Sequence, residues 1–540
     1  RGQVLALHRA YHDTGIALQT VQYIEAHATA TPRGDIVEFE ALNEVFKDRD
    51  GHLPPIELGS VKALIGHTGW LAGAASVIKT AEALKAKLVP PQHNFSKPNP
   101  KFDISRSPFS ISTAPKPWPE NAGGEPRRVG INGFGFGGSN AHMIMEEYVP
   151  QYHRSRWANT PKPVKSPMRV MGVVGIGALF PFSDNPQQSK TNGDNAPALR
   201  FNKSTIKLPK GLLVMPDVAD HMSEDQFLAC MATFDALKTI GEAWKMWKSE
   251  IGVILGVGGK TGRGISANKR IYLDFLERRL NEISESSNLP QSEFTHIKNE
   301  LLTSIRSIIP SGPYTLPGLM PNVTAGRVAN LFDLNGPNFV IDSGDYSLYE
   351  SLCSADAMLS TGKARMILAG GINGFAGPEA QYAENSPQTL GSRPIAEAAM
   401  VLALVSPDTA RTYNLPVLAE IEIFSDRPDA VPVDGIRVGE KGCPYYLKGA
   451  EGAFDLAEAI KAIEQKQKPA DLIWPAHHGE NDRIIRVAAP GTYELSKKDR
   501  TYGKQRSAVE VIDPAHPIFY CTPRLTAVDA KPVTMSYTIQ

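Results

Sequence analysis

Three short motifs near the start of the chain combine histidines with glycines and small hydroxyl side chains. Residues 25–35 read E-A-H-A-T-A-T-P-R-G-D, residues 59–68 read G-S-V-K-A-L-I-G-H-T, and residues 133–142 read G-F-G-F-G-G-S-N-A-H. The first two motifs supply His27 and His67. An imidazole can donate a hydrogen bond to an oxygen that gains negative charge during a reaction. The alternative is a pair of hydrogen-bonded core histidines, which we would favour for a lone histidine.

The order and wording of these motifs resemble the β-ketoacyl synthase (ketosynthase) family of fatty acid and polyketide synthases. The family forms are close to E-A-H-G-T-G-T-x-x-G-D, G-S-V-K-S-N-I-G-H and G-F-G-G-T-N-A-H. One such motif would be weak evidence, whereas three in order across most of residues 1–150 are strong evidence. The resemblance implies a thiolase-like fold and a decarboxylative Claisen condensation of malonyl-carrier protein with an acyl thioester.

The resemblance also assigns roles to side chains of the first two motifs. His27 and His67 match the family's two histidines, and each would donate a hydrogen bond to the malonyl thioester carbonyl. Lys62 matches a structural lysine that tunes the local field, and Asp35 and Glu38 stand at the positions of its expected partners. The alternative for Lys62 is an ordinary surface charge. We therefore predict that His27, Lys62 and His67 share one acyl-thioester pocket.

The resemblance implies a carrier-bound substrate and marks four residues that would contact it. Thr29 and Thr31 match threonines that bind the phosphopantetheine arm of a carrier protein, whose amides suit short hydroxyls. Phe136 matches the phenylalanine that gates the acyl pocket, and Gly137 belongs to the glycine run that lets the loop swing. The alternatives are local packing for the threonines and a structural turn for the loop. We expect no metal and no directly bound cofactor, because 4'-phosphopantetheine would arrive on an acyl carrier protein.

The positions of the four cysteines decide where a thiol nucleophile can be. Cys230, Cys353, Cys443 and Cys521 are too few and too scattered for a disulfide framework or a zinc site, so a cytoplasmic location is expected. None lies in the first block, although the family's catalytic cysteine should precede the E-A-H motif. We therefore expect the N-terminal half of this ketosynthase, with its nucleophile, to lie upstream, so that residues 1–150 cannot form an acyl-enzyme by themselves.

A second unit that resembles the start of a ketosynthase follows the first. Residues 322–342 resemble the segment that leads into the catalytic cysteine, but the next residues read S-G-D-Y-S where active members read T-A-C-S-S. Asp345 thus occupies the nucleophile position, and a carboxylate cannot replace a thiolate in thioester exchange. The position of the second histidine falls near Lys448 and Gly449. This pattern resembles a chain-length factor, the inactive partner that shapes a ketosynthase's acyl tunnel.

The pattern between the motifs predicts the elements that position them. Apolar, β-branched runs predict strands at 140–147, 169–177, 251–255, 339–341 and 366–369. Helices are predicted at 224–247 and 269–306. An internal echo of residues 59–79 in residues 442–461 places small residues before an alanine-rich helix in both units. Together these features indicate an α/β fold of the layered α-β-α-β-α, thiolase-like type.

Composition shifts divide the chain into four parts. We predict a ketosynthase C-terminal half at 1–150, a linker rich in Arg, Lys and Pro at 151–167, a chain-length-factor-like domain at 168–525, and the start of a further linker at 526–540. A tandem of this kind resembles the subunit of iterative polyunsaturated fatty acid synthases. Because the chain opens on Arg1 without leader character, we expect it to be a piece of a longer polypeptide.

The balance of charge excludes some classes of partner. Lys and Arg together number 57, as do Asp and Glu, which argues against a nucleic-acid binder or a membrane-surface protein. No apolar run reaches the ~18 residues that span a bilayer. The expected partners are an acyl carrier protein and a second ketosynthase-type unit, as a pseudo-dimer or homodimer. Two alternatives are a non-catalytic scaffold for carrier proteins or partner subunits, and a coenzyme A-dependent thiolase, which would use a second cysteine where ketosynthases use histidine.

Overall fold

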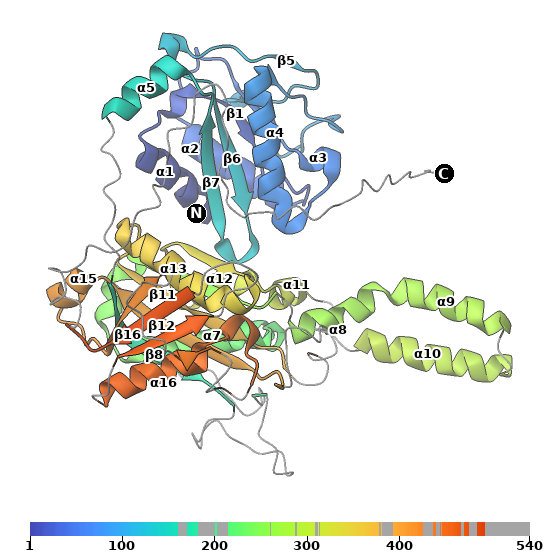
Figure 1. Ribbon diagram of the computed structural model, residues 1–540. Coiled ribbons are helices and arrows are strands. Elements are labelled where there is room, and N and C mark those ends of the chain that lie inside the picture. The colour runs from blue at the N-terminus through green and yellow to red at the C-terminus, as the bar shows by residue number, and fades with distance from the viewer. Residues whose placement is uncertain are drawn as a thin grey trace, which may run out of the picture.

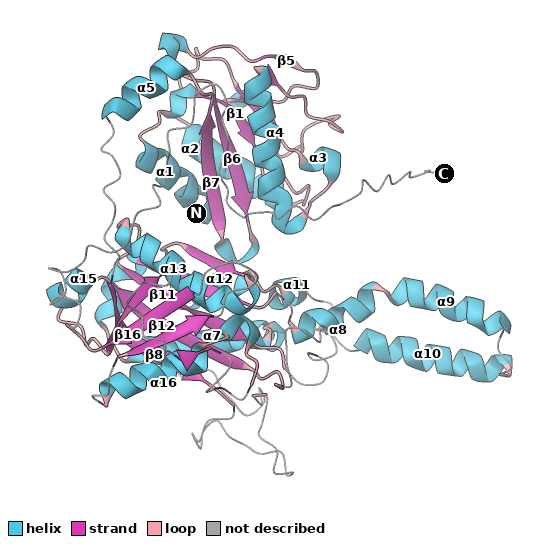
Figure 2. Ribbon diagram, viewed as in Figure 1, coloured by secondary structure: helices cyan, strands magenta, loops and turns pink. Residues whose placement is uncertain are grey.

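Two β-sheets, each covered by its own helices, form the part of the chain that the computed structural model describes (Figure 1). The described residues are 1–159, 170–181, 200–201, 214–259, 261–286, 289–307, 312, 314–376, 380, 393–424, 436–438, 443, 445–465, 469–474 and 483–491. The first unit also holds a short ribbon of β3 (Leu88–Val89) and β5 (Lys116–Pro117). Helices and strands alternate in both units (Figure 2), in agreement with the α/β pattern of the sequence.

The sheet of the first unit has the strand order β4-β2-β1-β6-β7. Its strands are β1 (Val21–Glu25), β2 (Ile56–Gly59), β4 (Phe109–Ser110), β6 (Arg128–Phe134) and β7 (Asn140–Glu146). The first four are parallel to their neighbours, and β7 runs antiparallel to β6. Since β1 and β2 are parallel neighbours, the loops that follow their carboxyl ends lie at one edge, and these loops carry the first two motifs.

Helices cover both faces of this first sheet. They are α1 (Gly2–Thr14), α2 (Gly34–Phe46), α3 (Lys62–Ile65), α4 (Ala72–Ala86) and α5 (Pro150–Asn159). Ile24 of β1 packs with Leu7 of α1 and Leu42 of α2 on one face, whereas Tyr23 packs with Leu84 of α4 and Trp118 on the other. Successive residues of a strand point to opposite faces, so the apolar run of β1 is buried on both sides.

The sheet of the second unit has the order β10-β9-β11-β12-β8-β13-β16-β15-β14. The strands are β8 (Val170–Leu179), β9 (Ile251–Val257), β10 (Asn338–Ile341), β11 (Met366–Asn373), β12 (Ala398–Val405), β13 (Ala419–Phe424), β14 (Ile436–Arg437), β15 (Ala470–Trp474) and β16 (Arg483–Ala488). Every residue of β9, β11 and β12 is buried, which requires cover on both faces.

That cover comes from helices on each side of the second sheet. Helices α7 (Glu224–Lys238) and α12 (Val323–Leu331) pack on one face, and α13 (Ser347–Ser360) and α16 (Ala453–Glu464) pack on the other. The remaining helices are α6 (Pro216–His221), α8 (Gly262–Ile271), α9 (Leu273–Ser286), α10 (Gln291–Ser307), α11 (Thr315–Leu319) and α15 (Pro407–Thr412). Helices α9 and α10 form a hairpin that projects from the body (Figure 1).

The strand predictions are confirmed, but both long helix predictions need correction. The helix predicted at 224–247 stops at Lys238 and continues after Gly241 as a 3-10 segment, Ala243–Glu250, because Gly241 adopts φ +65°. The helix predicted at 269–306 is divided among α8, α9 and α10, and Pro290 directly precedes α10. Proline lacks the N–H that an uninterrupted helix would use, so a break is favoured there.

The segment predicted as a linker at 151–167 begins as helix α5, which docks on the first unit. Arg128 donates to the Tyr152 hydroxyl at 2.8 Å, and the His153 side chain is buried with its Nε2 3.0 Å from a carboxylate oxygen of Glu146. Apolar periodicity could not predict this helix, because α5 docks through polar contacts and has no apolar face. Residues 160–169 and the tail predicted as a linker, 526–540, lie outside the described residues.

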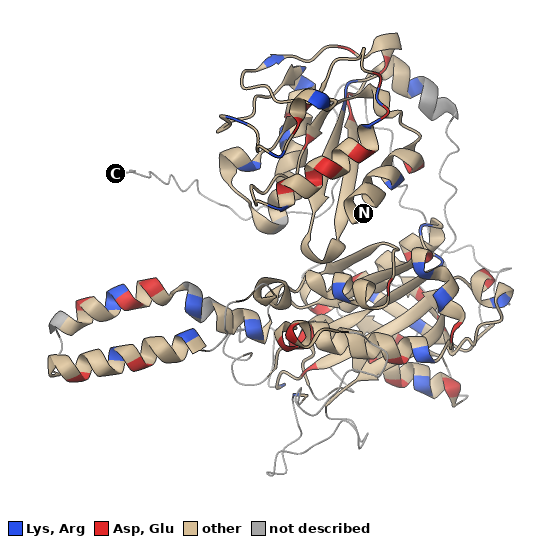
Figure 3. Cartoon of the chain, turned by 180° about the vertical axis from the view of Figure 1, so that it is seen from behind, with Lys and Arg blue, Asp and Glu red and all other residues tan. Residues whose placement is uncertain are grey.

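The two units touch through the glycine-rich loop and α1. A Cβ on Gly326 of α12 would lie 2.3 Å from the carbonyl oxygen of Gly137, so the two backbones are in direct contact. Ser139 donates to the Asn338 side chain at 3.2 Å, and Arg9 donates to the Asn335 carbonyl at 2.9 Å. Acidic and basic residues are interspersed over both units and the hairpin (Figure 3), in keeping with the zero formal net charge.

Candidate active site

The loop that carries His27 follows β1 and is held by two carboxylates of α2. Ala28 and Ala30 have backbone φ values of +32° and +60°, a region that residues other than glycine rarely occupy. Glu38 accepts the N–H of Ala28 at 2.8 Å, and Asp35 accepts the N–H of Ala30 at 3.1 Å. The N–H of His27 also donates to Glu38, at 2.8 Å. The surrounding hydrogen bonds thus impose the strained loop on the chain.

His67 lies at the end of the second motif, after the short helix α3 and Gly66. Gly66 has φ +74° and ends α3, so the chain turns and presents His67 at the surface of the pocket. The Nδ1 atom of His67 accepts the N–H of Gly69 at 3.1 Å. This hydrogen bond assigns the proton of the neutral ring to Nε2, which leaves an N–H available as a donor.

The structure brings the two histidines together. The ring centroids of His27 and His67 lie 5.5 Å apart with an interplanar angle of 88°. Phe134 closes one side of His27 with a ring-centroid distance of 6.1 Å. Two imidazoles at this separation can both reach one small acceptor, such as a carbonyl oxygen placed between them.

The environment keeps His27 neutral. Burial, with smaller contributions from the charges of the nearby Lys62 and His67, lowers its pKa from the ordinary 6.5 to about 4. Burial also lowers the pKa of Lys62, an effect that Glu25 and Glu38 oppose through their negative charges. A neutral imidazole whose proton is on a nitrogen facing the substrate acts as a hydrogen-bond donor without bringing a full charge.

A prediction for solution follows from these pKa values. The unfolded chain protonates His27 at the ordinary pKa, so between pH 6.5 and about 4 the unfolded state binds more protons and the folded state loses stability as pH falls. His142, whose pKa burial lowers to about 4, adds to the same trend. Titration of ring-labelled histidines by NMR should give midpoints near 4 for both residues. Midpoints near 6.5 would contradict the buried, neutral site.

The partners predicted for Lys62 need correction. The Lys62 side chain is buried, but among the described residues it forms an ion pair with neither Asp35 nor Glu38. Both carboxylates instead accept backbone N–H groups of the His27 loop, and Glu38 also accepts the side-chain N–H of Asn132 at 2.8 Å. The physical reason is that the left-handed alanines leave their N–H groups without strand or helix partners, and buried N–H groups require acceptors. Glu38 acts on Lys62 only through its field.

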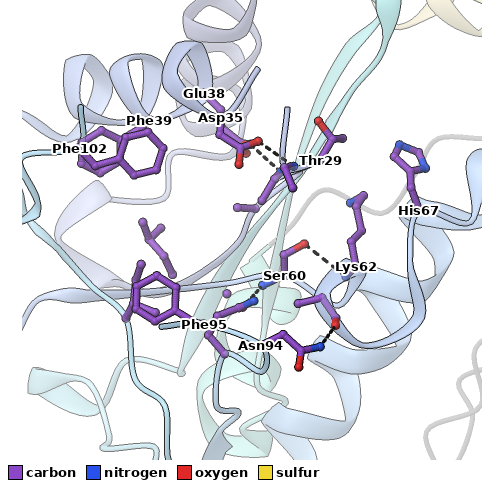
Figure 4. A pocket seen from close by; sticks show the side chains of 18 of the residues that line it. Thr29, Asp35, Glu38, Phe39, Ser60, Lys62, His67, Asn94, Phe95 and Phe102 are labelled. Carbon is purple, nitrogen blue, oxygen red and sulfur yellow. Dashed lines mark hydrogen bonds between the residues drawn. The ribbon is translucent and has the colours of Figure 1, made fainter. Parts of the chain in front are cut away.

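A cavity of about 440 Å³ extends from Lys62 and His67 to an apolar chamber (Figure 4). His27, predicted to share this pocket, is not itself a lining residue, although its neighbours Ala26 and Ala28 are. Lys62 and His67 line one side, and Asp35 and Glu38 line its wall. The chamber at the other end is lined by Phe39, Leu42, Phe95, Phe102 and Ile111. The Phe39 and Phe102 rings stack there at 4.5 Å and 14°. The cavity therefore offers a polar end for chemistry and an apolar end that excludes water.

The four residues predicted to contact the carrier-bound substrate are placed differently from one another. Thr29 lines the cavity. Thr31 accepts the N–H of Gly34 at 3.1 Å and thereby supports the start of α2. Phe136 is 53% exposed, in the 3-10 turn Phe136–Gly138, so nothing in its packing prevents movement. Gly137 contacts α12 of the second unit, which gives this glycine a packing role as well.

Five further side chains support the site, and the motifs alone did not reveal their roles. Asn132 donates to Glu38, and its oxygen is 2.7 Å from His142 Nδ1; the other ring nitrogen is 3.0 Å from the Tyr11 hydroxyl. His142, which ends the third motif, thus supports the His27 loop indirectly, through Asn132 and Glu38. Gln92 and Asn94 hold the turn that carries Lys62. The spacing of the motifs marks His142, but no sequence signal marks the loop at 92–94.

The second unit has a polar cluster around Asp345, the residue predicted to occupy the nucleophile position. Asp345 lies in the 3-10 turn Gly344–Tyr346 before α13, and the Tyr446 hydroxyl donates to its carboxylate. Lys448 is buried with φ +50°, and its ammonium lies 5.4 Å from the centre of the Phe375 ring. The segments around Lys62 and Lys448 share one local form, a short turn followed by the alanine-rich helices α4 and α16.

The described cysteines are poorly suited to nucleophilic chemistry. Burial raises the pKa of Cys230, Cys353 and Cys443 to about 12 in each case. A thiol with such a pKa has almost no thiolate at neutral pH. Cys521 lies outside the described residues.

Within the described residues, no helix combines the length and the apolar character that a bilayer crossing requires.

Three family models match the chain, in an order that agrees with two units. The beta-ketoacyl synthase C-terminal domain matches residues 1–96, and the ketoacyl-synthetase C-terminal extension matches residues 98–175. The beta-ketoacyl synthase N-terminal domain matches residues 208–393. The extension runs across the segment predicted as a linker, where α5 is found.

Curated relatives are similar over about a quarter of the chain. A highly reducing polyketide synthase of Emericella nidulans is 42% identical over 149 residues, which are 28% of this chain and 6% of that protein. Polyketide synthase PksL of Bacillus subtilis is 40% identical over 146 residues, 27% of this chain and 3% of that protein. The aligned part is therefore a small share of these relatives' own length.

A solved structure described as PfaC Keto synthase-Chain length factor resembles most of the chain. The likeness has a TM-score of 0.63 at 18% sequence identity and covers 90% of this chain and 59% of that chain. At this identity the likeness shows the fold, which is the thiolase-like fold predicted from the motifs. The chain therefore belongs to the β-ketoacyl synthase family: a C-terminal domain of the family, with its extension, is followed by an N-terminal domain of the family.

Proposed function

We propose that the first unit provides the decarboxylating half of a β-ketoacyl synthase active site. The observation that carries the proposal is the edge-to-face pair of imidazoles, His27 and His67, whose ring centroids lie 5.5 Å apart, with His67 lining a cavity that has an apolar end. The substrate would be a malonyl group on the 4'-phosphopantetheine of an acyl carrier protein. The chain is similar to polyketide synthases, which supports a carrier-bound substrate.

The proposed reaction has two stages, a decarboxylation and the formation of a carbon–carbon bond. The bond between the malonyl α-carbon and its carboxylate breaks, carbon dioxide leaves, and the electron pair forms an enolate whose oxygen accepts hydrogen bonds from His27 and His67. The enolate carbon then attacks the carbonyl carbon of an acyl group held as a thioester, and the carbon–sulfur bond breaks to release a cysteine thiolate. We infer that this cysteine belongs to a family N-terminal domain upstream of the chain, because the first unit contains no cysteine.

Lys62, Thr29 and Phe136 have supporting roles in this proposal. The Lys62 ammonium adds positive field at the end of the cavity where the enolate forms. Thr29 lines the route of the phosphopantetheine arm, with Thr31 next to it at 3.4 Å between the hydroxyl oxygens. Phe136 and Gly137 form the gate over the acyl group. The cytoplasmic location predicted from the cysteine content stays a prediction.

We further propose that the second unit is a non-catalytic partner. Its support is the Asp345 carboxylate, held by Tyr446 at the position of the nucleophile, and the buried Lys448 near the position of the second histidine. A unit with these residues cannot hold an acyl group as a thioester, but it can bury a face of a ketosynthase and limit the acyl tunnel. The same substitutions favour the alternative of a scaffold that docks carrier protein or partner subunits, for this second unit.

One experiment tests both proposals. The polypeptide of the complete reading frame is incubated with malonyl- and acyl-carrier protein, and products and acylated peptides are identified by mass spectrometry. We expect a 3-ketoacyl thioester, release of carbon dioxide, and an acyl adduct on a cysteine of the upstream domain, with none on the peptide that contains Asp345. Absence of both product and carbon dioxide would sink the condensation proposal. An adduct within the second unit would sink its assignment as a non-catalytic partner.

A further inference from the structure

One buried carboxylate outside the proposed catalytic set reaches the backbone that carries Lys62. Glu25 is the last residue of β1, and its side chain is fully buried. Its Oε1 accepts the N–H of Val61 at 2.6 Å, immediately before α3 begins. Lys62 opens α3, and His67 follows the end of this short helix. Glu25 therefore holds the start of the segment that presents both groups to the cavity.

The charge of Glu25 is balanced within the same buried cluster. Lys79 of α4 donates to Oε2 at 2.7 Å, and the Tyr23 hydroxyl donates to the same oxygen at 3.2 Å. Ser76, also on α4, donates to Oε1 at 3.4 Å. The Lys79 side chain is only 13% exposed, so this ion pair is largely out of water. A buried carboxylate that is paired in this way keeps a fixed orientation, and it joins β1, the turn and α4.

Two amide side chains complete the hold on the turn at residues 60–63. Gln92 accepts the N–H of Ser60 at 2.7 Å, and Asn94 donates to the carbonyl of Ala63 at 2.6 Å. Asn94 itself has φ +53°, a left-handed conformation that asparagine adopts more readily than most residues. With Glu25, three side chains from two other segments satisfy three backbone groups of one four-residue turn. Such a turn has little freedom to move.

We propose that Glu25 is a positioning residue that fixes Lys62 and His67 relative to His27. His27 stands two residues beyond Glu25 on the same strand end, and the N–H of Ala26 donates to the Gly59 carbonyl at 2.7 Å. The carboxylate thus ties one histidine's strand to the other histidine's turn. The consequence for the reaction rests on the proposed function, but the consequence for the geometry does not.

The test uses Glu25→Gln, which keeps the shape of the side chain and removes its charge. A glutamine has one acceptor oxygen, so it cannot serve the Val61 N–H on one side and Lys79 on the other. In the polypeptide of the complete reading frame we expect kcat to fall by about 10- to 100-fold with little change in KM for malonyl-carrier protein, as for a small misplacement of reacting groups. Addition of Lys79→Met should restore part of kcat, because the glutamine oxygen is then free for Val61.

A second readout is independent of activity. Burial, and after it the charges of Lys62 and His67, lower the pKa of His27 to about 4, so in the 540-residue chain the NMR midpoint of His27 should shift in Glu25→Gln, because Lys62 and His67 are displaced. The matched control is Glu147→Gln, which breaks another buried pair, with Arg127 at 2.5 Å, away from the cavity. We expect the control to change neither kcat nor the His27 midpoint.

The outcomes separate this proposal from the proposed function. A folded Glu25→Gln protein with unchanged kcat and an unchanged His27 midpoint would overturn the positioning role. An inactive wild-type protein with its upstream domain would count against the proposed function, and the NMR midpoint would then decide the positioning role by itself. If the single variant does not fold, the Glu25→Gln/Lys79→Met variant, in which positioning is restored only in part, is compared with wild type: a lowered kcat with a shifted His27 midpoint would support the positioning role, and wild-type values of both would overturn it.

Discussion

Replacement of His27 by alanine is expected to slow decarboxylation of malonyl-carrier protein by about 10²- to 10³-fold, the usual cost of one lost donor to a developing oxyanion. The reason is the geometry of the pair: with the rings 5.5 Å apart, each imidazole supplies one hydrogen bond to the enolate oxygen. His67→Ala should have a similar effect. The double variant should be less impaired than the product of the two single effects, because both donors serve one oxygen.

The measurement is release of labelled carbon dioxide in single turnovers, with the polypeptide of the complete reading frame. His52→Ala is the matched control, because His52 is an exposed histidine of the same unit outside the cavity. Acyl transfer to the upstream cysteine should persist in all four variants, which separates loss of decarboxylation from loss of fold. Rates within a factor of two of wild type for His27→Ala would refute the role of this residue.

Glu38→Ala is expected to destabilise the first unit by about 3–5 kcal/mol, because a buried donor left without a partner costs about 1–3 kcal/mol. Glu38 accepts three hydrogen bonds, from the backbone of His27 and Ala28 and from the Asn132 side chain. Its own side chain is 5% exposed, so water cannot replace the lost oxygens without opening the site. Glu38→Gln should lower the free energy of unfolding by less, because one oxygen remains for His27 and Asn132. Its NH2 group would face the N–H of Ala28.

Urea unfolding of the 540-residue chain, read by hydrogen exchange at amides of β1 and β6, measures this loss in the first unit. Glu44→Ala is the matched control on the same helix. Its carboxylate is 57% exposed and pairs with Lys47 at 3.3 Å, and such surface pairs contribute little. Equal free energies of unfolding for Glu38→Ala and Glu44→Ala would show that the His27 loop does not depend on Glu38.

Local sequence patterns predicted the strands well, because buried strands leave a dense apolar signal. The runs at β9, β11 and β12 are apolar throughout, and they are buried on both faces. Helix ends were predicted less well, because a single residue decides them. Gly241, with φ +65°, ends α7 early, although the residues after it still look helical.

The site shows a similar division between what motifs reveal and what they omit. Motif order indicated that His27, Lys62 and His67 lie together, because parallel strands β1 and β2 bring the loops after them to one edge. The partners of the carboxylates were mispredicted, because opposite charge suggested Lys62 while the strained backbone required acceptors. Gln92 and Asn94 depend on how a distant loop packs, and no local pattern carries that information.

The two left-handed alanines give the His27 loop an unusual dependence on its neighbour. Because Glu38 and Asp35 impose the backbone of Ala28 and Ala30, the loop has no stable shape of its own. The conformation of the loop depends on α2, and side chains such as Leu42 pack α2 against the sheet. If heat or a cavity-forming substitution loosens this packing of α2, the loop that carries His27 should therefore become disordered before the sheet unfolds.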